Sequence, residues 1–189
     1  MGGIRDLLRE GLLPARPDPP LPPGTPSGVL VPLIERDSSP PALLLTVRSQ
    51  EVRDHKGEIS FPGGVRHSED QDLLTTAMRE TEEELGIPAD GYEVLGALPH
   101  VDTVVSGYVI VPFVAVLHDM PELDPSPAEI AEVLEMEVEQ LDRVEEEVRL
   151  GASPGWFAYT VDHHTVWGAT GRIVNSFLET LRRAGWRGG

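Results

Sequence analysis

The sequence predicts an α/β protein with a single domain, in which a mixed β-sheet lies between helices. Its 189 residues are enough for one domain with a proper hydrophobic core. Short runs of branched apolar residues predict strands, and stretches with apolar residues at helical spacing predict helices. The predicted order of elements is β-β-β-α-β-β-β-α, which favours a mixed sheet covered by helices.

The N-terminal segment is expected to differ from the rest of the chain. Apolar residues at helical spacing predict a short helix over 3–12. Seven prolines in 14–26 predict an extended arm. The arm could be a disordered leader, a strap across the domain or a dimer contact. We therefore expect an N-terminal helix and arm over 1–27, followed by the main domain over 28–189.

The main domain is expected to begin with a β-hairpin. Apolar runs at 27–36 and 42–48 predict its two strands, with a turn rich in Ser and Pro between them. Pro32 indicates that the first strand is an edge strand or carries a bulge. A short strand over 57–61 then leads into a pair of glycines, which predicts a sharp bend.

The second half of the chain is expected to add strands and a terminal helix. Branched and alternating apolar residues predict strands over 92–98 and 108–117. The runs 156–161 and 164–167 resemble the two arms of a closing hairpin. A helix from about 170 to 183 carries apolar residues at core spacing.

A helix after the glycine pair, Gly63 and Gly64, carries most of the candidate site residues. It is expected to start near Ser68, because Ser68-x-x-Gln71 fits a capping box. It should stop at Gly86, since glycine with a proline shortly after it is a strong C-terminal signal.

Three glutamates of this helix form a candidate metal site. At about 100° per residue, Glu80, Glu83 and Glu84 fall on one face, beside an apolar stripe that would pack on the sheet. Like charges at this spacing destabilise a helix, and an Arg79–Glu83 pair offsets part of that cost. A solvated acidic face explains Glu82, which points away, but it does not explain the glycine bend and the stripe. A bound Mg²⁺ or Mn²⁺ would explain the whole arrangement, because hard cations bind carboxylate oxygens and offset the repulsion between them.

A cluster of positive residues precedes the glycine pair in a chain whose formal net charge is −17. Its members are Arg48, Arg53, His55 and Lys56. Guanidinium groups bind phosphate oxygens in a bidentate manner, so the two arginines are candidates for phosphate binding. Considered by charge alone, pairing with neighbouring acids on a solvated loop is the favoured alternative.

Composition excludes several classes of function. The net charge of −17 argues against general binding of nucleic acids or anionic membranes, which needs a basic patch. The lack of cysteine excludes disulfides, thiolate nucleophiles and thiolate zinc sites. No apolar run approaches the length of a membrane span and no signal-peptide pattern is evident, so the cytoplasm is the expected location.

The segment 79–87, RETEEELGI, resembles the second half of the Nudix hydrolase signature. That signature is G-x5-E-x7-R-E-U-x-E-E-x-G-U, where U is aliphatic, and Thr81 stands in one aliphatic slot. The first half fits only if one residue is inserted after Gly64. Asp70 or Asp72 then replaces the isolated Glu of the signature, which leaves open whether this chain keeps the structural salt bridge usually given to that Glu.

A second pattern lies directly upstream. Residues 44–64, LLTVRSQEVRDHKGEISFPGG, meet every specified position of LLT-x-R-(S/A)-x3-R-x3-G-x3-FPGG. This pattern is similar to the extra signature of the coenzyme A pyrophosphatase branch of the Nudix hydrolases. The motif Trp167-Gly-Ala-Thr170 near the C-terminus also resembles sequences of that branch.

The resemblance implies a Nudix-type α/β/α sandwich and a metal-dependent hydrolase. The expected reaction is cleavage of coenzyme A, or of a derivative, to 3′,5′-ADP and 4′-phosphopantetheine. Glu80 and Glu84 would be the principal ligands of Mg²⁺ or Mn²⁺, and Glu83 a further ligand or a water-orienting base. Arg79 would orient the glutamates.

The resemblance also implies where the substrate binds. Arg48 and Arg53 would contact its phosphates, next to Gly63 and Gly64. A backbone carbonyl of either glycine would complete the metal shell. A further acid from a later loop often joins the site in this family, and two residues are candidates, Glu129 and Glu132.

Two other functions stay open. The chain could hydrolyse another nucleotide, such as ADP-ribose, a dinucleoside polyphosphate or NADH. It could also be a non-catalytic Nudix-like module that binds a ligand or a partner. The intact upstream pattern favours coenzyme A over the first alternative, and the three retained glutamates favour an enzyme over the second. The oligomeric state and the preferred form of coenzyme A do not follow from the sequence.

Overall fold

The computed structural model describes residues 3–15, 19–37, 39–50, 57–103, 107–118, 120–148 and 156–188. The helices are α1 (Ile4–Gly11), α2 (Leu73–Leu85), α3 (Val138–Arg143) and α4 (Gly168–Arg183). The strands are β1 (Thr25–Arg36), β2 (Ser39–Arg48), β3 (Ile59–Ser60), β4 (Gly63–Val65), β5 (Glu93–Ala97), β6 (Val101–Asp102), β7 (Tyr108–Leu117), β8 (Ile130–Glu137), β9 (Glu145–Val148), β10 (Trp156–Val161) and β11 (His164–Val166). Among these helices, none is both long and apolar enough to cross a membrane.

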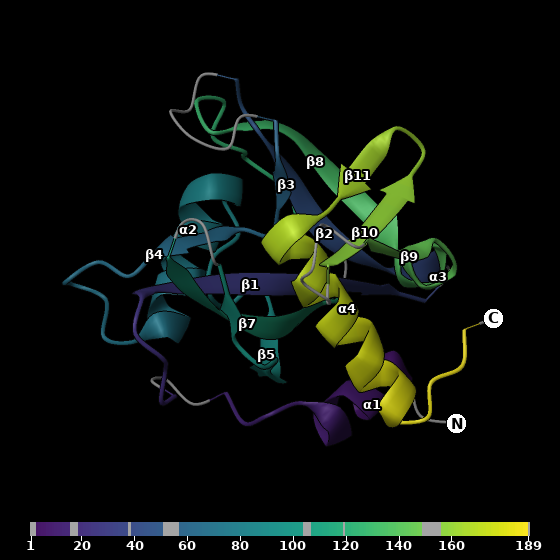
Figure 1. Ribbon diagram of the computed structural model, residues 1–189. Coiled ribbons are helices and arrows are strands. Elements are labelled where there is room, and N and C mark those ends of the chain that lie inside the picture. The colour runs from purple at the N-terminus through teal and green to yellow at the C-terminus, as the bar shows by residue number, and fades with distance from the viewer. Residues whose placement is uncertain are drawn as a thin grey trace.

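An eight-stranded mixed sheet forms the centre of the domain (Figure 1). Its main path is β3-β2-β1-β7-β5, while β4 pairs with β1, β6 with β7 and β8 with β2. β1 and β7 run parallel along their whole shared length, and the other pairs are antiparallel. A smaller sheet has the order β11-β10-β9. The predicted mixed sheet is confirmed.

Helices cover both faces of the large sheet because successive residues of β1 point to opposite sides. Val29, Val31 and Leu33 belong to a core that includes the apolar residues of α1 and α4. Leu30 and Ile34 belong to a second core that includes the apolar residues of α2. The domain is therefore an α/β/α sandwich, as the sequence predicts.

Pro32 does not mark an edge strand, so that alternative of the sequence prediction is wrong; the other alternative, a bulge, agrees with a register shift between Ile34 and Arg36 in the pairing of β1 with β2. β1 is the central strand of the main path, between β2 and β7. On one side its partner changes along its length: β4 pairs with residues 27–29, and β2 pairs from Leu33 onward. Pro32 lies between these two segments. Its missing N–H therefore interrupts neither ladder.

The same change of partner splits the sheet into two branches. β3 pairs with β2, whereas β4 pairs with β1, and only Phe61 and Pro62 join β3 to β4. At this corner the Leu30 N–H donates a hydrogen bond of 2.9 Å to the Pro62 carbonyl. We call this point the fork. The glycine pair follows it directly, beside the N-terminal part of β1.

The N-terminal helix packs on the domain. Ile4 and Leu8 of α1 are buried in the core shared with α4. After α1, Leu13 forms two backbone hydrogen bonds with Ala97 of β5, of 3.0 and 2.8 Å. These contacts lie just before the arm, for which the three alternatives stay open.

Candidate active site

Helix α2 carries the predicted carboxylates and begins later than predicted. Asp72 is its N-cap, and the Asp72 carboxylate accepts hydrogen bonds from the N–H and the hydroxyl of Thr75, at 2.7 and 2.9 Å. The predicted start near Ser68 is therefore wrong, because the residue that caps the helix is Asp72, four residues further on. The predicted stop at Gly86 is confirmed, with a φ of 71° that suits glycine.

Asp70 anchors Arg79 by a bidentate ion pair. Its buried carboxylate lies 3.0 Å from Nε and 3.1 Å from Nη2 of Arg79. It also accepts hydrogen bonds from the His67 N–H and the Thr76 hydroxyl, both at 2.9 Å. The hydrogen bond to Arg79, with those from His67 and Thr76, holds the pKa of Asp70 well below its usual range. Of the two candidates for the salt bridge, Asp70 forms it and Asp72 caps the helix.

The remaining nitrogen of Arg79 reaches two glutamates. Its Nη1 atom lies 2.9 Å from Oε1 of Glu80 and 2.9 Å from Oε2 of Glu83. The hydrogen bond to Asp70 raises the pKa of Arg79, so this guanidinium stays charged. One anchored cation thus holds two carboxylates in place, which is the arrangement that an orienting role for Arg79 requires.

The three glutamates share a face but differ strongly in burial. Glu84 is 3% exposed, whereas the side chains of Glu80 and Glu83 are 16% and 59% exposed. Glu84 belongs to the buried set of α2 rather than adjoining it, and that set is Leu73, Thr76, Ala77, Thr81, Glu84 and Leu85. The helix therefore points Glu84 toward the sheet and Glu83 toward solvent.

Glu84 is a buried carboxylate whose negative charge is only weakly offset by neighbouring groups. Burial raises its pKa to about 8, and the charges of Glu80 and Glu129 add to this rise. Arg48, whose Nη1 lies 4.0 Å from Glu84 Oε1, and the Gly63 backbone amide oppose it. Glu84 Oε2 is buried, and no described group donates a hydrogen bond to it. This atom needs a proton or a cation.

The glycine pair lets the backbone approach α2 closely. A Cβ on Gly64 would lie 2.5 Å from Oε1 of Glu80, so the Glu80 carboxylate rests against the Gly64 backbone. Gly63 has a φ of 153°, and a Cβ there would lie 2.5 Å from the Gly28 carbonyl. A larger residue at Gly63 would push β4 away from β1, and one at Gly64 would displace the Glu80 carboxylate.

Arg48 is the part of the predicted phosphate site that the structure describes. It is the last residue of β2, at the fork, and its side chain is 28% exposed. Its Nε is buried, and no group in the described ranges accepts a hydrogen bond from it. Arg53, His55 and Lys56 lie outside the described residues.

The structure distinguishes between Glu129 and Glu132, the two candidates for a further acid that joins the site from a later loop. Glu129 follows the loop before β8, and its carbonyl accepts a 2.7 Å hydrogen bond from the N–H of Ser49, next to Arg48. Its charge acts on Glu84. Glu132 lies instead 3.3 Å from Nε2 of His164. The structure thus brings Glu129, rather than Glu132, toward the helical glutamates.

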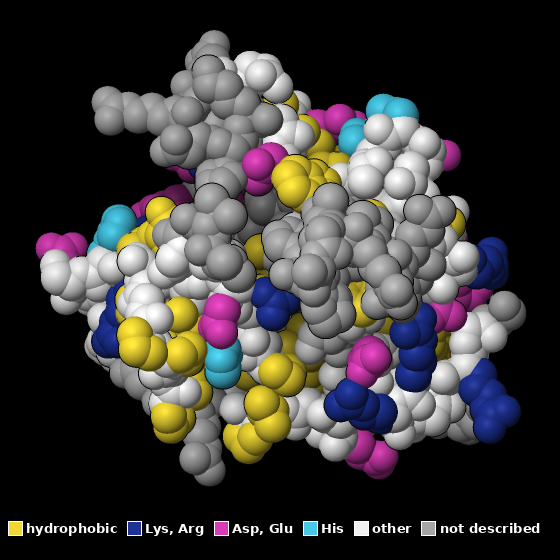
Figure 2. All heavy atoms as spheres, in the orientation of Figure 1, with side chains coloured by type: hydrophobic (Ala, Val, Ile, Leu, Met, Phe, Trp, Pro, Cys, Tyr) yellow, Lys and Arg dark blue, Asp and Glu magenta, His cyan; other side chains and the backbone are white. Residues whose placement is uncertain are grey.

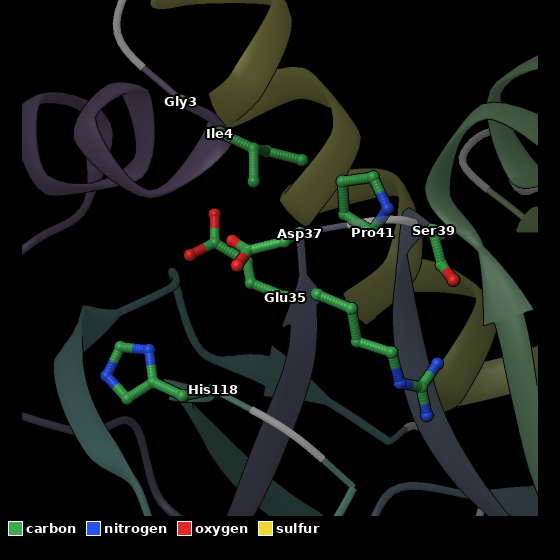
Figure 3. A pocket seen from close by; sticks show the side chains of 8 residues that line it. Gly3, Ile4, Glu35, Asp37, Ser39, Pro41 and His118 are labelled. Atoms are coloured by element: carbon green, nitrogen blue, oxygen red, sulfur yellow. The ribbon is translucent and has the colours of Figure 1, made fainter.

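A separate pocket of about 550 Å³ opens at the other end of β1 (Figure 3). Its lining residues are Gly3, Ile4, Glu35, Arg36, Asp37, Ser39, Pro41 and His118. This set contains none of the predicted site residues. The buried carboxylate, the glycine approach and Arg48 all lie at the fork, so we place the candidate active site there.

Comparison with known proteins agrees with this geometry. The NUDIX domain family matches residues 24–154. The chain belongs to the Nudix hydrolase family. It is 36% identical over 153 residues to the uncharacterized Nudix hydrolase NudL of Citrobacter koseri, a match that covers 78% of each chain. Both proteins are therefore alike over most of their length.

Solved structures show the same Nudix fold at low identity. A MutT/nudix family protein from Enterococcus faecalis has a TM-score of 0.58 at 14% identity, covering 88% of this chain and 66% of that one. The NUDIX domain of Shewanella oneidensis NrtR, complexed with ADP ribose, has a TM-score of 0.51 at 17% identity. The match covers 65% of this chain and 79% of that one.

Nudix hydrolases generally use divalent metal ions, and the carboxylates at the fork fit such an ion in their chemistry. Within the described ranges, no three His, Asp or Glu side chains are grouped closely enough to hold a metal as they stand. However, Glu84 Oε2 has no hydrogen-bond partner among the described groups, and Glu80 and Glu84 repel each other. An all-oxygen donor set suits Mg²⁺ or Mn²⁺. In the structure, Arg79 provides positive charge beside Glu80, and Arg48 provides it beside Glu84.

Replacing Asp70 by Asn should lower the free energy of unfolding at neutral pH by about 3 kcal/mol, because it removes the charged partner of Arg79. The pKa of Asp70 is lowered in the folded protein, so its stabilisation is present above a pH of about 4 and is lost as the pH falls below that value. Urea denaturation should therefore show the gap to wild type narrowing in acid. Asp72→Asn keeps a good cap and should cost under about 0.5 kcal/mol. Equal losses for both variants would contradict this account.

Glu84 should make the metal-free protein more stable as the pH falls. Its pKa of about 8 in the folded protein exceeds the ordinary value of 4.5, so the folded state takes up a proton between these pH values and the unfolded state does not. With EDTA present, Tm should rise as the pH is lowered from about 8.5 to about 6. Glu84→Gln should show a smaller rise, which reflects only the general negative charge. An equal change of Tm with pH in wild type and Glu84→Gln would rule out a raised pKa for Glu84.

Proposed function

We propose that this Nudix hydrolase cleaves the pyrophosphate bond of coenzyme A, or of a derivative, to give 3′,5′-ADP and 4′-phosphopantetheine. One observation carries the proposal: Arg48, which the upstream pattern specifies, lies 4.0 Å from the buried Glu84 at the fork. Two motifs that are separate in the sequence therefore contribute to one site. The motif that resembles a coenzyme A signature supplies its positive charge.

Glu80 and Glu84 are the proposed principal ligands of Mg²⁺ or Mn²⁺. The unpartnered Oε2 of Glu84 and the raised pKa values of both carboxylates support this assignment. Glu83 is proposed as a further ligand or as the group that orients water, and a carbonyl of Gly63 or Gly64 as an additional ligand. A bound divalent ion neutralises pyrophosphate charge and lowers the pKa of a coordinated water.

Arg79 is proposed as a positioning residue rather than a substrate contact. Asp70 occupies its Nε and Nη2, and Glu80 and Glu83 share its Nη1. These contacts engage every nitrogen of the guanidinium. Arg79 therefore fixes the directions of the two carboxylates and leaves the binding of phosphate to other arginines.

Arg48 and Arg53 are proposed to bind the substrate phosphates. Coenzyme A carries a pyrophosphate and a 3′-phosphate, and in a chain of net charge −17 an anionic substrate needs a local cluster of cations. The partly exposed guanidinium of Arg48 can reach solvent at the fork while it lies beside Glu84. A guanidinium binds two phosphate oxygens at once, which an exposed lysine does not.

Glu129 is proposed as the acid that joins the site from a later loop. Its charge acts on Glu84, and its backbone is held beside the end of β2 by the hydrogen bond from Ser49. A fourth carboxylate at the fork would serve as an additional metal ligand or as a general base for water. Glu132 is engaged by His164 and is not proposed for this role.

A second candidate is the hydrolysis of another nucleoside diphosphate derivative, such as ADP-ribose or NADH. The similarity to the NrtR NUDIX domain, which is complexed with ADP ribose, favours it at the level of the fold. All of these compounds share an ADP group. They differ in the 3′-phosphate, which coenzyme A carries and ADP-ribose lacks.

Replacing Glu84 by Gln should reduce kcat by at least about 10³-fold with Mg²⁺, because the neutral amide cannot replace a ligating carboxylate. Glu82→Gln is the matched control: Glu82 is exposed on the same helix, and its loss should change kcat less than twofold. Circular dichroism should show both variants folded. A Glu84→Gln protein with full turnover would remove Glu84 from the metal site.

The substrate is tested by a product assay with coenzyme A, dephospho-coenzyme A and ADP-ribose, each offered with Mg²⁺ or Mn²⁺. We expect coenzyme A to be turned over best, with 3′,5′-ADP as a product. Arg53→Ala should then raise KM for coenzyme A more than for ADP-ribose, because it removes a contact to the 3′-phosphate. Preferred hydrolysis of ADP-ribose would keep the Nudix chemistry and overturn the assignment of coenzyme A.

A further inference from the structure

The loop between β7 and β8 docks on the C-terminal end of α2. We call residues 121–129 the β7–β8 loop. The last carbonyls of an α-helix have no partners within the helix. Here the Ser126 N–H donates a 3.0 Å hydrogen bond to the Glu84 carbonyl, and the Asp124 N–H donates one of 3.0 Å to the Leu85 carbonyl. A segment that is distant in the sequence therefore completes the end of the helix that carries the glutamates.

Gly86 allows this close approach. It has a φ of 71°, and a Cβ there would lie 3.0 Å from the Cβ of Asp124. Leu123 of the loop packs against the core that includes Leu85 and Ile87. The loop thus contacts the end of α2 through its backbone and through an apolar side chain. Gly86 both ends the helix and leaves room for the loop.

A tight turn leads from Ser126 to Glu129. The Ser126 carbonyl accepts hydrogen bonds from the N–H groups of Glu129 and Ile130, at 3.0 and 2.8 Å. Pro127 holds the second position of this turn, where the fixed φ of proline suits the backbone. Ser126 therefore binds α2 through its N–H and the start of β8 through its carbonyl. The turn fixes the backbone of Glu129 relative to that of Glu84.

Glu129 is held by its backbone rather than by its side chain. The residue is exposed, and no side chain in the described ranges forms an ion pair with it. In Figure 2, the basic side chains on the face drawn gather mainly toward the C-terminal end of α4, away from β8. The hydrogen bonds to Ser126 and from Ser49 hold the Glu129 backbone on both sides. The direction of its carboxylate therefore depends on the geometry of the turn.

We infer that Ser126 and Pro127 are positioning residues, whose turn holds the Glu129 carboxylate at the metal site of Glu84. This inference rests on the proposed function, in which Glu84 binds Mg²⁺ or Mn²⁺ and Glu129 joins it from the loop. A carboxylate on a free loop would have to be ordered each time an ion binds, whereas one on a rigid turn is already in place. Because the loop is bonded to the backbone of Glu84, the two residues keep a fixed separation.

The test is a double-mutant cycle on the affinity of the full chain for Mn²⁺, measured by calorimetry without nucleotide. Glu129→Gln should weaken Mn²⁺ binding about 10-fold, because it removes a negative charge beside the ion. Pro127→Gly should weaken it about fivefold, because the loosened turn no longer places that charge. The double variant should match Glu129→Gln within about twofold, since both changes act through one carboxylate.

Pro121→Gly is the matched control. It removes a proline from the same loop, ahead of the residues that dock on α2, and it frees the unfolded chain to a similar extent. It should change the Mn²⁺ affinity less than about twofold. Amide exchange followed by NMR should show the Glu129 N–H exchanging at least about 10-fold faster in Pro127→Gly than in Pro121→Gly. Circular dichroism should show all variants folded.

Two results would overturn the inference. Equal weakening by Pro127→Gly with and without the Glu129 carboxylate would show that the turn only supports the fold. Wild-type affinity in either single variant would show that the turn places no charge beside the ion. The cycle needs no nucleotide, so it holds whichever compound is hydrolysed. Failure of coenzyme A in the product assay is therefore distinguishable from failure of the positioning role.

Discussion

The close approach of α2 to the forked sheet is the constraint on which the site depends. A Cβ on Gly28 of β1 would lie 2.1 Å from the Leu73 carbonyl at the start of α2. Further along the helix, Gly64 leaves room for the Glu80 carboxylate. Without these two glycines the helix could not pack at this distance, and Glu84 would not be buried beside β4. The close approach of the backbone at these two glycines thus determines how deeply the carboxylates are buried.

Burial creates an electrostatic problem that the arginines of the site answer in part. Asp70 and Arg79 form a fixed ion pair, and the same guanidinium also contacts Glu80 and Glu83, whose charges it offsets only in part. Glu84 is left with Arg48 at 4.0 Å, which is a weak compensation for a carboxylate that is 3% exposed. A site with this imbalance favours a small cation of high charge. The cost in stability is therefore a property of the binding site itself.

The sequence predicts β1, β2, β3, β5, β7, β10 and β11, the stop of α2 and the shared face of its glutamates, because these follow from local periodicity. It does not predict β4, β6, β8, β9 or α3. Of the two explanations that it allows for Pro32, the edge strand is wrong, since the position of that residue depends on a change of strand partner far away in the chain. It misplaces the start of α2, because Ser68 and Asp72 are both acceptable caps and the ion pair of Asp70 decides between them. The burial of Glu84 also escapes prediction, because a helical wheel does not reveal where the sheet lies.

The most direct measurement is the position of Mn²⁺ in crystals of the protein, located by anomalous scattering. The account predicts a peak bonded to Oε2 of Glu84 and to the carboxylate of Glu80, next to Gly64. It also predicts that Arg79 keeps its bidentate contact with Asp70. A peak that touches neither glutamate, for example one in the pocket of Glu35 and Asp37, would contradict the assignment of the active site to the fork.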